Sequence, residues 1–192
     1  MTARISLQHL NSCPPEAFGS VLADIWEHAP WVARSVAGQR PFPDADALHG
    51  AMVAVVAALG EDERIAFYAG HPELAGDDAR RGTMTAASVD EQGALGLEHL
   101  AAHEARRWDE LNRAYRERFG FPFILCIRRH TRESALRAFE QRLRNDRAAE
   151  LDNALAEIAA ITRLRLDRLL APADAASAPS APSLLTSSSI PS

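Results

Sequence analysis

His71 is the residue whose neighbours in the sequence best suit acid–base chemistry. It follows Gly70, which is expected to end a helix, and it precedes Pro72, which favours an extended backbone at His71. A histidine has an unperturbed pKa of about 6.5, so it can transfer protons near neutral pH. A partly buried histidine that caps a helix is the simpler interpretation, and position alone favours it over a catalytic role.

The segment Ser88-Val-Asp-Glu-Gln92 brings together three further polar groups. On a helix, the spacing places Ser88 beside both Glu91 and Gln92, so one face would present a hydroxyl, a carboxylate and an amide. The same pattern is typical of a capping box, with Ser88 at the N-cap and Glu91 in the first turn. Spacing alone leaves both interpretations open.

Arg165 is the most unusual residue of the last predicted helix. With about 100° of rotation per residue, it falls almost in line with Ile158 at the centre of the apolar face. A guanidinium on such a face is costly unless it pairs with an acid or binds an anion. The sequence therefore predicts either a structural ion pair or an anion-binding side chain.

His99 and His103 are spaced so that they could share a metal ion on one helix. No third ligand is apparent, and His103 is expected on the polar side of its helix. A solvent-exposed face is the favoured interpretation, so we expect no metal site. A metal-dependent hydrolase that uses these two histidines stays as an alternative.

Helical periodicity dominates the part of the chain that must position these residues. A turn is expected around 28–31, because Pro30 disfavours a helix at the residue before it. The helix that begins at Asp44 is apolar on nearly all sides and is expected to be central and buried. The predicted helices run from an N-cap at Ser12 through Leu22, Asp44 to Leu59, Glu61 to Ala69, about Leu97 to Phe119, Arg132 to Arg144, and Ala148 to Leu170.

One segment interrupts this helical pattern. Residues 119–127 contain Gly120 and Pro122 and are too apolar for an exposed loop, so we expect a short buried extended segment. No alternating strand pattern is present, which predicts an all-α fold with a single-domain helical bundle over 1–170. Residues 171–192 are rich in Ala, Pro and Ser, and we expect a disordered tail there.

Composition excludes several classes of function. The 192 residues carry 26 acids and 21 bases for a net charge of −5, so no basic surface for nucleic acid is expected. All the bases are arginines, which excludes Schiff-base chemistry on a lysine. No apolar run is long enough for a membrane span, and no signal peptide is expected. Cys13 and Cys126 suit a reducing cytoplasm and form no zinc cluster.

Five short motifs, taken in order, resemble those of the 2-oxo-4-hydroxy-4-carboxy-5-ureidoimidazoline (OHCU) decarboxylase family, the last enzymes of the route from urate to S-allantoin. Each motif alone is weak, but the set is specific, and the resemblance covers about Leu7 to Leu170. The matching stretches are His71-Pro-Glu-Leu-Ala-Gly76, Ser88-Val-Asp-Glu-Gln92, Leu111-Asn112 with Tyr115, Phe119-Gly-Phe-Pro-Phe123, and Glu157-Ile-Ala-Ala-Ile161 followed by Arg165-Leu166.

The resemblance implies a fold, an activity and a set of site residues. It implies an all-helical bundle of the OHCU decarboxylase type, no cofactor, no metal and a homodimer. Matched position by position, the family's catalytic residues fall on His71, Glu91 and Arg165. Substrate contacts are implied at Pro72, Ser88 and Gln92, and at backbone amides of about Phe121 to Ile124, Phe123 included.

The chemistry implied by the resemblance agrees with the composition. In OHCU the reacting carbon carries a carboxylate and a hydroxyl beside a ring C=N, which can accept the electron pair released with carbon dioxide. This built-in electron sink explains why neither a lysine nor a metal is needed. The expected function is a cofactor-free carboxy-lyase in the cytoplasm; the alternative is a non-catalytic helical interaction module with Arg165 paired structurally.

Overall fold

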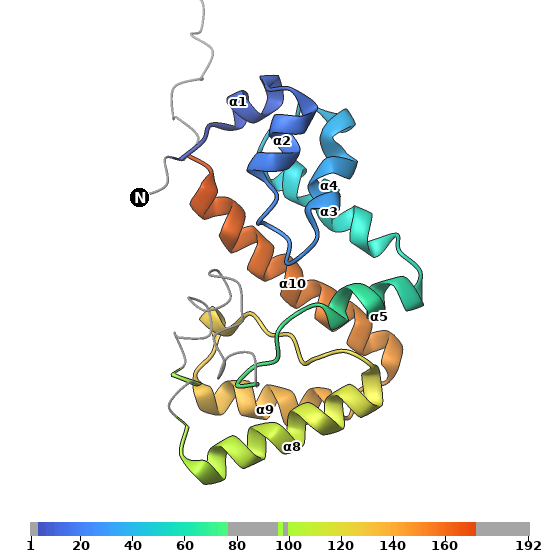
Figure 1. Ribbon diagram of the computed structural model, residues 1–192, viewed down its shortest axis with the longest axis vertical. Coiled ribbons are helices and arrows are strands. Elements are labelled where there is room, and N and C mark those ends of the chain that lie inside the picture. Colours follow the sequence, from blue (N-terminus) through green and yellow to red (C-terminus); the bar gives the residue numbers. More distant parts are fainter. Residues whose placement is uncertain (1–3, 77–95, 98–99, 172–192) are drawn as a thin grey trace, which may run out of the picture.

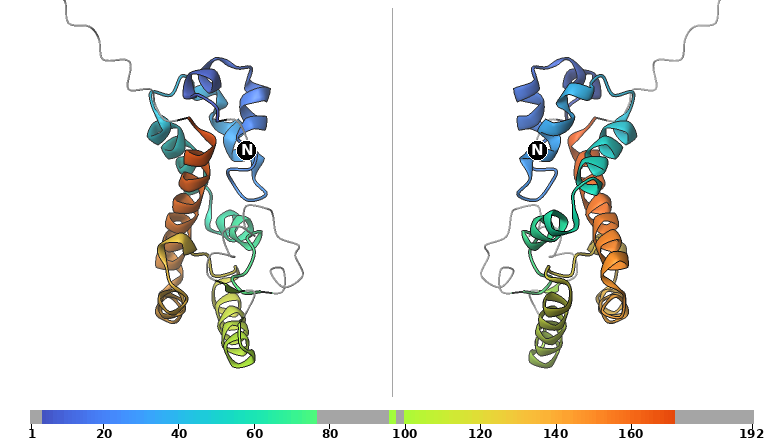
Figure 2. Two further views of the ribbon diagram at one scale, coloured as in Figure 1. Left: turned by 90° about the vertical axis from the view of Figure 1, so that its left-hand side faces the viewer. Right: turned by 90° about the vertical axis from the view of Figure 1, so that its right-hand side faces the viewer.

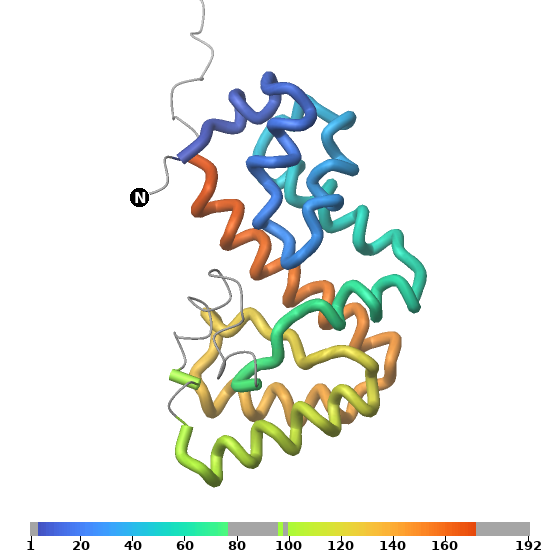
Figure 3. The backbone as a smooth tube through the Cα atoms, viewed as in Figure 1, coloured from blue at the N-terminus to red at the C-terminus, as the bar shows by residue number. Residues whose placement is uncertain are grey.

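The computed structural model describes residues 4–76, 96–97 and 100–171, and its axis is the long helix α10 (Arg147–Leu169) (Figure 1). Asp146 caps this helix, because its side chain accepts a hydrogen bond from the N–H of Ala149. The tube view shows that α10 passes through both halves of the molecule, with the N-terminal helices at one end and α8 and α9 at the other (Figure 3). Its buried stripe includes Leu151, Ala154, Ile158, Thr162, Arg165 and Leu166.

The N-terminal helices pack around the C-terminal half of α10. A short parallel bridge between Ile5 and Leu170 joins the two ends of this half, with Ile5 donating to the carbonyl of Leu169 over 3.0 Å. Buried Leu10, Phe18 and Met52 contribute to its core. The elements are α1 (Leu7–Ser12), α2 (Pro15–Val21), α3 (Pro30–Val36), the 3₁₀ helix η1 (Ala37–Gln39) and α4 (Ala45–Ala57).

Two sequence predictions fail in this half. Ser12 is the last residue of α1 and not the N-cap of the next helix, which Pro14 precedes. The α4 helix begins next to its predicted start, with Asp44 as its N-cap, but it is not buried on all sides. It buries one stripe of Leu48, Met52 and Val56, whereas Ala54 and Ala57 are exposed. Alanine tolerates both environments, so an alanine-rich helix does not reveal which of its faces is covered.

The other half is built from the elements that follow α4. The side views show α5 (Glu61–Ala69) and α8 (Ala102–Phe119) on the same side of α10 (Figure 2). The bounds of α5 match the prediction. The helix predicted from Leu97 begins five residues later, because Glu104 accepts a hydrogen bond from the N–H of Ala101 and caps α8 there. The remaining helices are η3 (Ile127–Arg129) and α9 (Arg132–Arg142).

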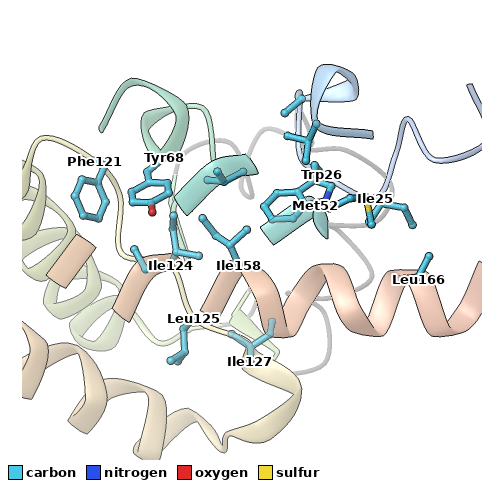
Figure 4. Close-up of a cluster of buried hydrophobic side chains, with 14 of the residues drawn as sticks. Ile25, Trp26, Met52, Tyr68, Phe121, Ile124, Leu125, Ile127, Ile158 and Leu166 are labelled. Atoms are coloured by element: carbon cyan, nitrogen blue, oxygen red, sulfur yellow. The ribbon is translucent and has the colours of Figure 1, made fainter. Parts of the chain in front are cut away.

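The buried extended segment predicted over 119–127 is confirmed over 121–126, since Phe119 ends α8 and Ile127 begins η3. Gly120 ends α8 with a left-handed φ of 86°, and residues 121–126 then run without helix or strand through the core. Phe123 stacks on Phe139 of α9 with ring centroids 3.9 Å apart. Figure 4 shows Ile124 from this segment beside Ile158 of α10.

The fold class is also confirmed: the described part of the chain is helical and contains no strand. Within it, no helix is long and apolar enough to cross a membrane. The predicted tail, 171–192, lies outside the described residues except for Ala171, whose N–H donates to the carbonyl of Ile5 over 2.9 Å.

Candidate active site

His71 lies directly after α5, at the helix end that the sequence predicted. Gly70 caps the helix, and the backbone N–H of His71 donates to the carbonyl of Tyr68 over 3.0 Å. The imidazole meets the ring of Phe67 edge-on, with centroids 5.3 Å apart. Its Nδ1 atom is buried and has no hydrogen-bond partner among the described residues. A buried ring nitrogen without a partner is unusual in a folded protein, so this imidazole stands out among the buried side chains.

A pocket opens beside His71, between α10 and the extended segment. Its lining includes several of the residues that the sequence analysis singled out, namely His71, Pro72, Phe123, Ile124 and Arg165. The polar residues Glu27, Cys126, Arg128 and Thr162 also line it, together with Leu74, Leu125, Ile127, Ile158, Ile161 and Leu164. The pocket is mostly apolar, and its charged groups are concentrated at a few positions, which is the usual composition of a small-molecule site.

Arg165 forms an ion pair inside this pocket wall. Its Nη1 donates to Oε2 of Glu27 over 2.8 Å, and the exposed side-chain fractions are 9% for Arg165 and 3% for Glu27. The sequence left open whether Arg165 pairs with an acid or binds an anion. The structure shows the acid, but it also places the pair where a bound anion would meet it.

Glu27 is the residue that sequence reasoning missed. It lies in the turn before α3, and 138 positions separate it from Arg165. The only available signal was local: a charged residue follows Ile25 and Trp26, which are both buried. That pattern indicates that Glu27 is held near the core, but it does not identify the partner.

The pocket holds His71 in its neutral form. Burial lowers the pKa of His71 from 6.5 to about 4, since a desolvated imidazolium is unfavourable. The negative charge of Glu27 raises this pKa, and the positive charge of Arg165 lowers it. A neutral imidazole can accept a proton or a hydrogen bond, which suits a general base.

Two contacts from α8 hold the backbone that follows His71. Asn112, which is buried, donates from Nδ2 to the carbonyl of Leu74 over 2.9 Å. Arg116 forms an ion pair with Glu73, with its Nη2 at 2.8 Å from Oε1. The α8 helix therefore positions the His71-Pro72 wall of the pocket, although Asn112 itself does not line it.

The opposite wall is held by side chains of α9 and α10. Arg142 donates from Nη1 to the carbonyl of Ile124 over 2.8 Å, and its guanidinium lies 4.6 Å from the centroid of Phe123. The backbone N–H of Cys126 donates to Oε2 of Glu157 over 2.7 Å. These bonds supply partners inside the protein for a segment that has no strand or helix partner.

The other predicted site residues lie elsewhere. Phe121 does not line the pocket; its ring packs against Tyr68 and Tyr115, with centroids 5.2 and 5.8 Å away. His103 is exposed on α8, as expected for the polar side of that helix. Among the described residues, no group of His, Cys, Asp and Glu side chains could hold a metal ion. Ser88, Glu91, Gln92 and His99 lie outside the described residues.

Comparison with known proteins agrees with this architecture. A family model described as OHCU decarboxylase matches residues 11–167. The chain is 38% identical over 161 residues to the 2-oxo-4-hydroxy-4-carboxy-5-ureidoimidazoline decarboxylase of Mus musculus, covering 84% of this chain and 90% of the relative. It is 32% identical over 171 residues to that of Halalkalicoccus jeotgali, covering 89% and 95%.

Solved structures show the same fold. A crystal structure of (S)-allantoin synthase superimposes with a TM-score of 0.70 at 26% identity and covers 86% of this chain. The match covers 54% of that chain, so the present protein spans about half its length. A second structure, an OHCU decarboxylase in the presence of (S)-allantoin, matches with a TM-score of 0.54 at 22% identity and supports the fold alone.

Proposed function

The chain belongs to the OHCU decarboxylase family, and from that premise we propose that its pocket decarboxylates OHCU to S-allantoin, the last step of urate degradation. The enzyme is a carboxy-lyase. The observation that carries the proposal is the lining of one pocket by His71, with a buried unpartnered Nδ1, and by Arg165. A proton acceptor and a fixed cation are the two groups that this reaction requires from the protein.

The chemistry divides between substrate and protein. The bond from the reacting carbon to its carboxylate breaks, carbon dioxide leaves, and the electron pair moves toward the ring C=N. The ring nitrogen takes a proton as the electron pair reaches it. The planar enol intermediate then loses its hydroxyl proton and gains a proton on one face of the carbon of the former C=N, which gives a single enantiomer. The substrate supplies the electron sink, so the protein needs to orient the substrate, place charge and manage protons.

His71 and Arg165 take the two protein roles. Neutral His71 takes the proton of the substrate hydroxyl on its imidazole and delivers it to the reacting face of the carbon that becomes the stereocentre. Arg165 hydrogen-bonds the anionic and carbonyl oxygens of the substrate, because a guanidinium matches planar oxygen pairs. Glu91 orients the imidazole or the substrate hydroxyl in this proposal, and that role rests on the family resemblance.

The remaining contacts belong to the two backbone walls. We assign substrate contacts to Pro72, Phe123 and Ile124, which line the pocket. Phe121 enters the proposal through its backbone, since its ring packs in the aromatic core. Ser88 and Gln92 are assigned by resemblance. The hydrogen bonds from Arg142 and to Glu157 support this assignment, because they hold the extended segment in place.

Further parts of the proposal concern the whole chain. By resemblance, the enzyme works without a cofactor as a homodimer, and we assign it to the cytoplasm. Light scattering of the purified protein tests the dimer.

The proposal also divides the chain. Residues 1–170 form the catalytic domain, and 171–192 are a tail outside it. Deletion after Ala171 should leave activity and solubility intact, and loss of soluble protein would contradict the domain assignment.

The direct test is the decay of freshly generated OHCU. Circular dichroism of the allantoin formed should show faster production of the S enantiomer with the protein than without it. Activity that persists in the presence of a chelator would agree with the proposal and contradict a metal-dependent reaction. A racemic product formed at the spontaneous rate would refute the proposal and would favour a non-catalytic interaction module.

A further inference from the structure

We propose that Glu27 is a positioning residue for the decarboxylation: its carboxylate fixes the orientation in which the guanidinium of Arg165 meets the substrate. The inference rests on the proposed function, and it adds a residue that lies far in the sequence from every motif of the family resemblance. Glu27 acts through Arg165, so its contribution is to geometry and charge.

The contact itself is short and nearly closed to water. Nη1 of Arg165 lies 2.8 Å from Oε2 of Glu27, and both side chains are at least nine-tenths buried. A hydrogen bond between two charged groups at this distance is directional. Because the guanidinium is planar and rigid, fixing the direction of one N–H bond fixes the orientation of the whole group. Both residues also line the pocket that contains His71.

Glu27 is held on a rigid support. The preceding residues, Ile25 and Trp26, are buried, and the N–H of Ala29 donates to the carbonyl of Trp26 over 3.1 Å. The chain then reverses at His28, which adopts a left-handed φ of 51°, so that α3 can begin at Pro30. A carboxylate on so constrained a turn has little freedom to move, which is what a positioning group requires.

An aromatic row connects this turn to the catalytic histidine. The ring of Trp26 lies 6.2 Å from that of Phe67, and Phe67 in turn lies 5.3 Å from the ring of His71. Glu27 and His71 are therefore held by one packed group of side chains. The charges are also coupled: Glu27 raises the pKa of His71, in opposition to Arg165.

A second ion pair on the same helix provides a matched control. Arg163 pairs with Asp46 on α4 and with Asp167 one turn later. Asp46 is exposed, and neither Asp46 nor Arg163 lines the pocket. Replacing Glu27 by Gln and Asp46 by Asn removes the same charge from an arginine partner in both cases. Only the first change should affect the reaction.

The experiment compares Glu27→Gln and Asp46→Asn with the wild type for turnover of fresh OHCU. We expect Glu27→Gln to lower kcat by on the order of 10- to 100-fold, because a small misplacement of a catalytic group has effects of this size. KM should not rise, since the substrate still meets a guanidinium that has lost its counter-charge. Asp46→Asn should stay within about twofold of the wild type.

Three kinetic results would overturn the inference. An unchanged kcat in folded Glu27→Gln, an increase in KM alone, or an equal loss in Asp46→Asn would each show that Glu27 has no positioning role. A wild type that does not accelerate OHCU decay would instead refute the proposed function, and this inference with it. A structural role alone lowers the melting temperature and leaves kcat of the folded protein unchanged.

A measurement on the wild type covers the case in which Glu27→Gln does not fold. The ¹⁵N signals of the Arg165 guanidinium, assigned by their absence from Arg165→Lys, report on rotation about the Cζ–Nη bonds. A guanidinium held by Glu27 should give separate Nη signals because its rotation is slow. Averaged signals would show that Arg165 rotates freely, and they would overturn the inference without any change to Glu27.

Discussion

Two buried arginine–glutamate pairs lie near opposite ends of α10, and they differ in what surrounds them. Arg142 donates from Nε to Oε1 of Glu150 over 2.7 Å. Glu150 is fully buried, and it also accepts hydrogen bonds from Tyr115 and Asn145. This pair is enclosed by protein side chains. The pair of Arg165 with Glu27 instead lines the pocket that contains His71.

The difference predicts that the same chemical pair supports stability in one place and the proposed chemistry in the other. Around Glu150 the protein provides the carboxylate's hydrogen-bond partners, so loss of one partner leaves a buried charge uncompensated. Around Arg165 the pocket brings the guanidinium to a space that a small molecule can enter. Substitutions near the first pair should therefore reduce stability, and substitutions near the second should reduce turnover.

The largest expected effect belongs to the pocket. His71→Ala should lower turnover of fresh OHCU by on the order of 10²- to 10⁴-fold, since it removes the proposed general acid–base group. Far-UV circular dichroism should show an unchanged helical fold. A folded His71→Ala protein with near-normal turnover would contradict the proposal that this pocket is the active site.

Arg142→Met tests the enclosed pair. Glu150 would then stay buried without its cation, so we expect a loss of about 3–5 kcal/mol in the free energy of unfolding, measured by urea titration. Replacing Arg142 and Glu150 together by apolar residues should recover part of this loss. A stability loss below about 1 kcal/mol would mean that this pair is not enclosed as described.

Arg165→Lys sharpens the contrast between the two arginines. The charge is retained but the planar fork is lost, so turnover should fall by about 10-fold or more, while the fold is kept. Enzyme assays beside a urea titration separate the two effects. If unfolding free energy falls as steeply as in Arg142→Met and the folded enzyme keeps its turnover, both pairs are structural.

Acidification provides a test of the buried imidazole. Burial lowers the pKa of His71 from 6.5 to about 4 in the folded protein, so the unfolded chain binds more protons between these values. The contribution of neutral His71 is therefore complete above about pH 6.5 and is lost as the pH falls toward 4. Between about pH 6.5 and about pH 5, wild type should lose up to roughly 2 kcal/mol more unfolding free energy than His71→Ala. Equal losses would contradict a neutral, buried His71.

The smallest expected effect lies outside both regions. His103 is exposed on α8, so His103→Ala should leave turnover and unfolding free energy nearly unchanged. The sequence alone predicts the same for His99→Ala. The same turnover and urea measurements apply. A large loss of activity in either variant would favour the metal-dependent alternative and would require a third ligand.

Local features of the chain were predictable from the sequence. Gly70 marks a helix end and Asp44 marks a helix start through interactions within a few residues, and the structure has both boundaries. Gly120 and Pro122 break a helix, and the apolar residues beside them identify the buried extended segment. The angular position of Arg165 on its helix also required only periodicity. Each prediction depended on neighbours in sequence, which is why it could be made without a structure.

Only the tertiary structure decided how these pieces meet. The partner of Arg165 is 138 positions away in a turn, and no local pattern identifies it. The same holds for the exposed alanines of α4, because burial depends on which element packs against a face. Local propensity and capping determine where helices begin and end, but long-range packing determines which charges are brought together and which of them line a pocket. In this protein, long-range packing places the buried Arg165 beside Glu27 and in the lining of the candidate active site.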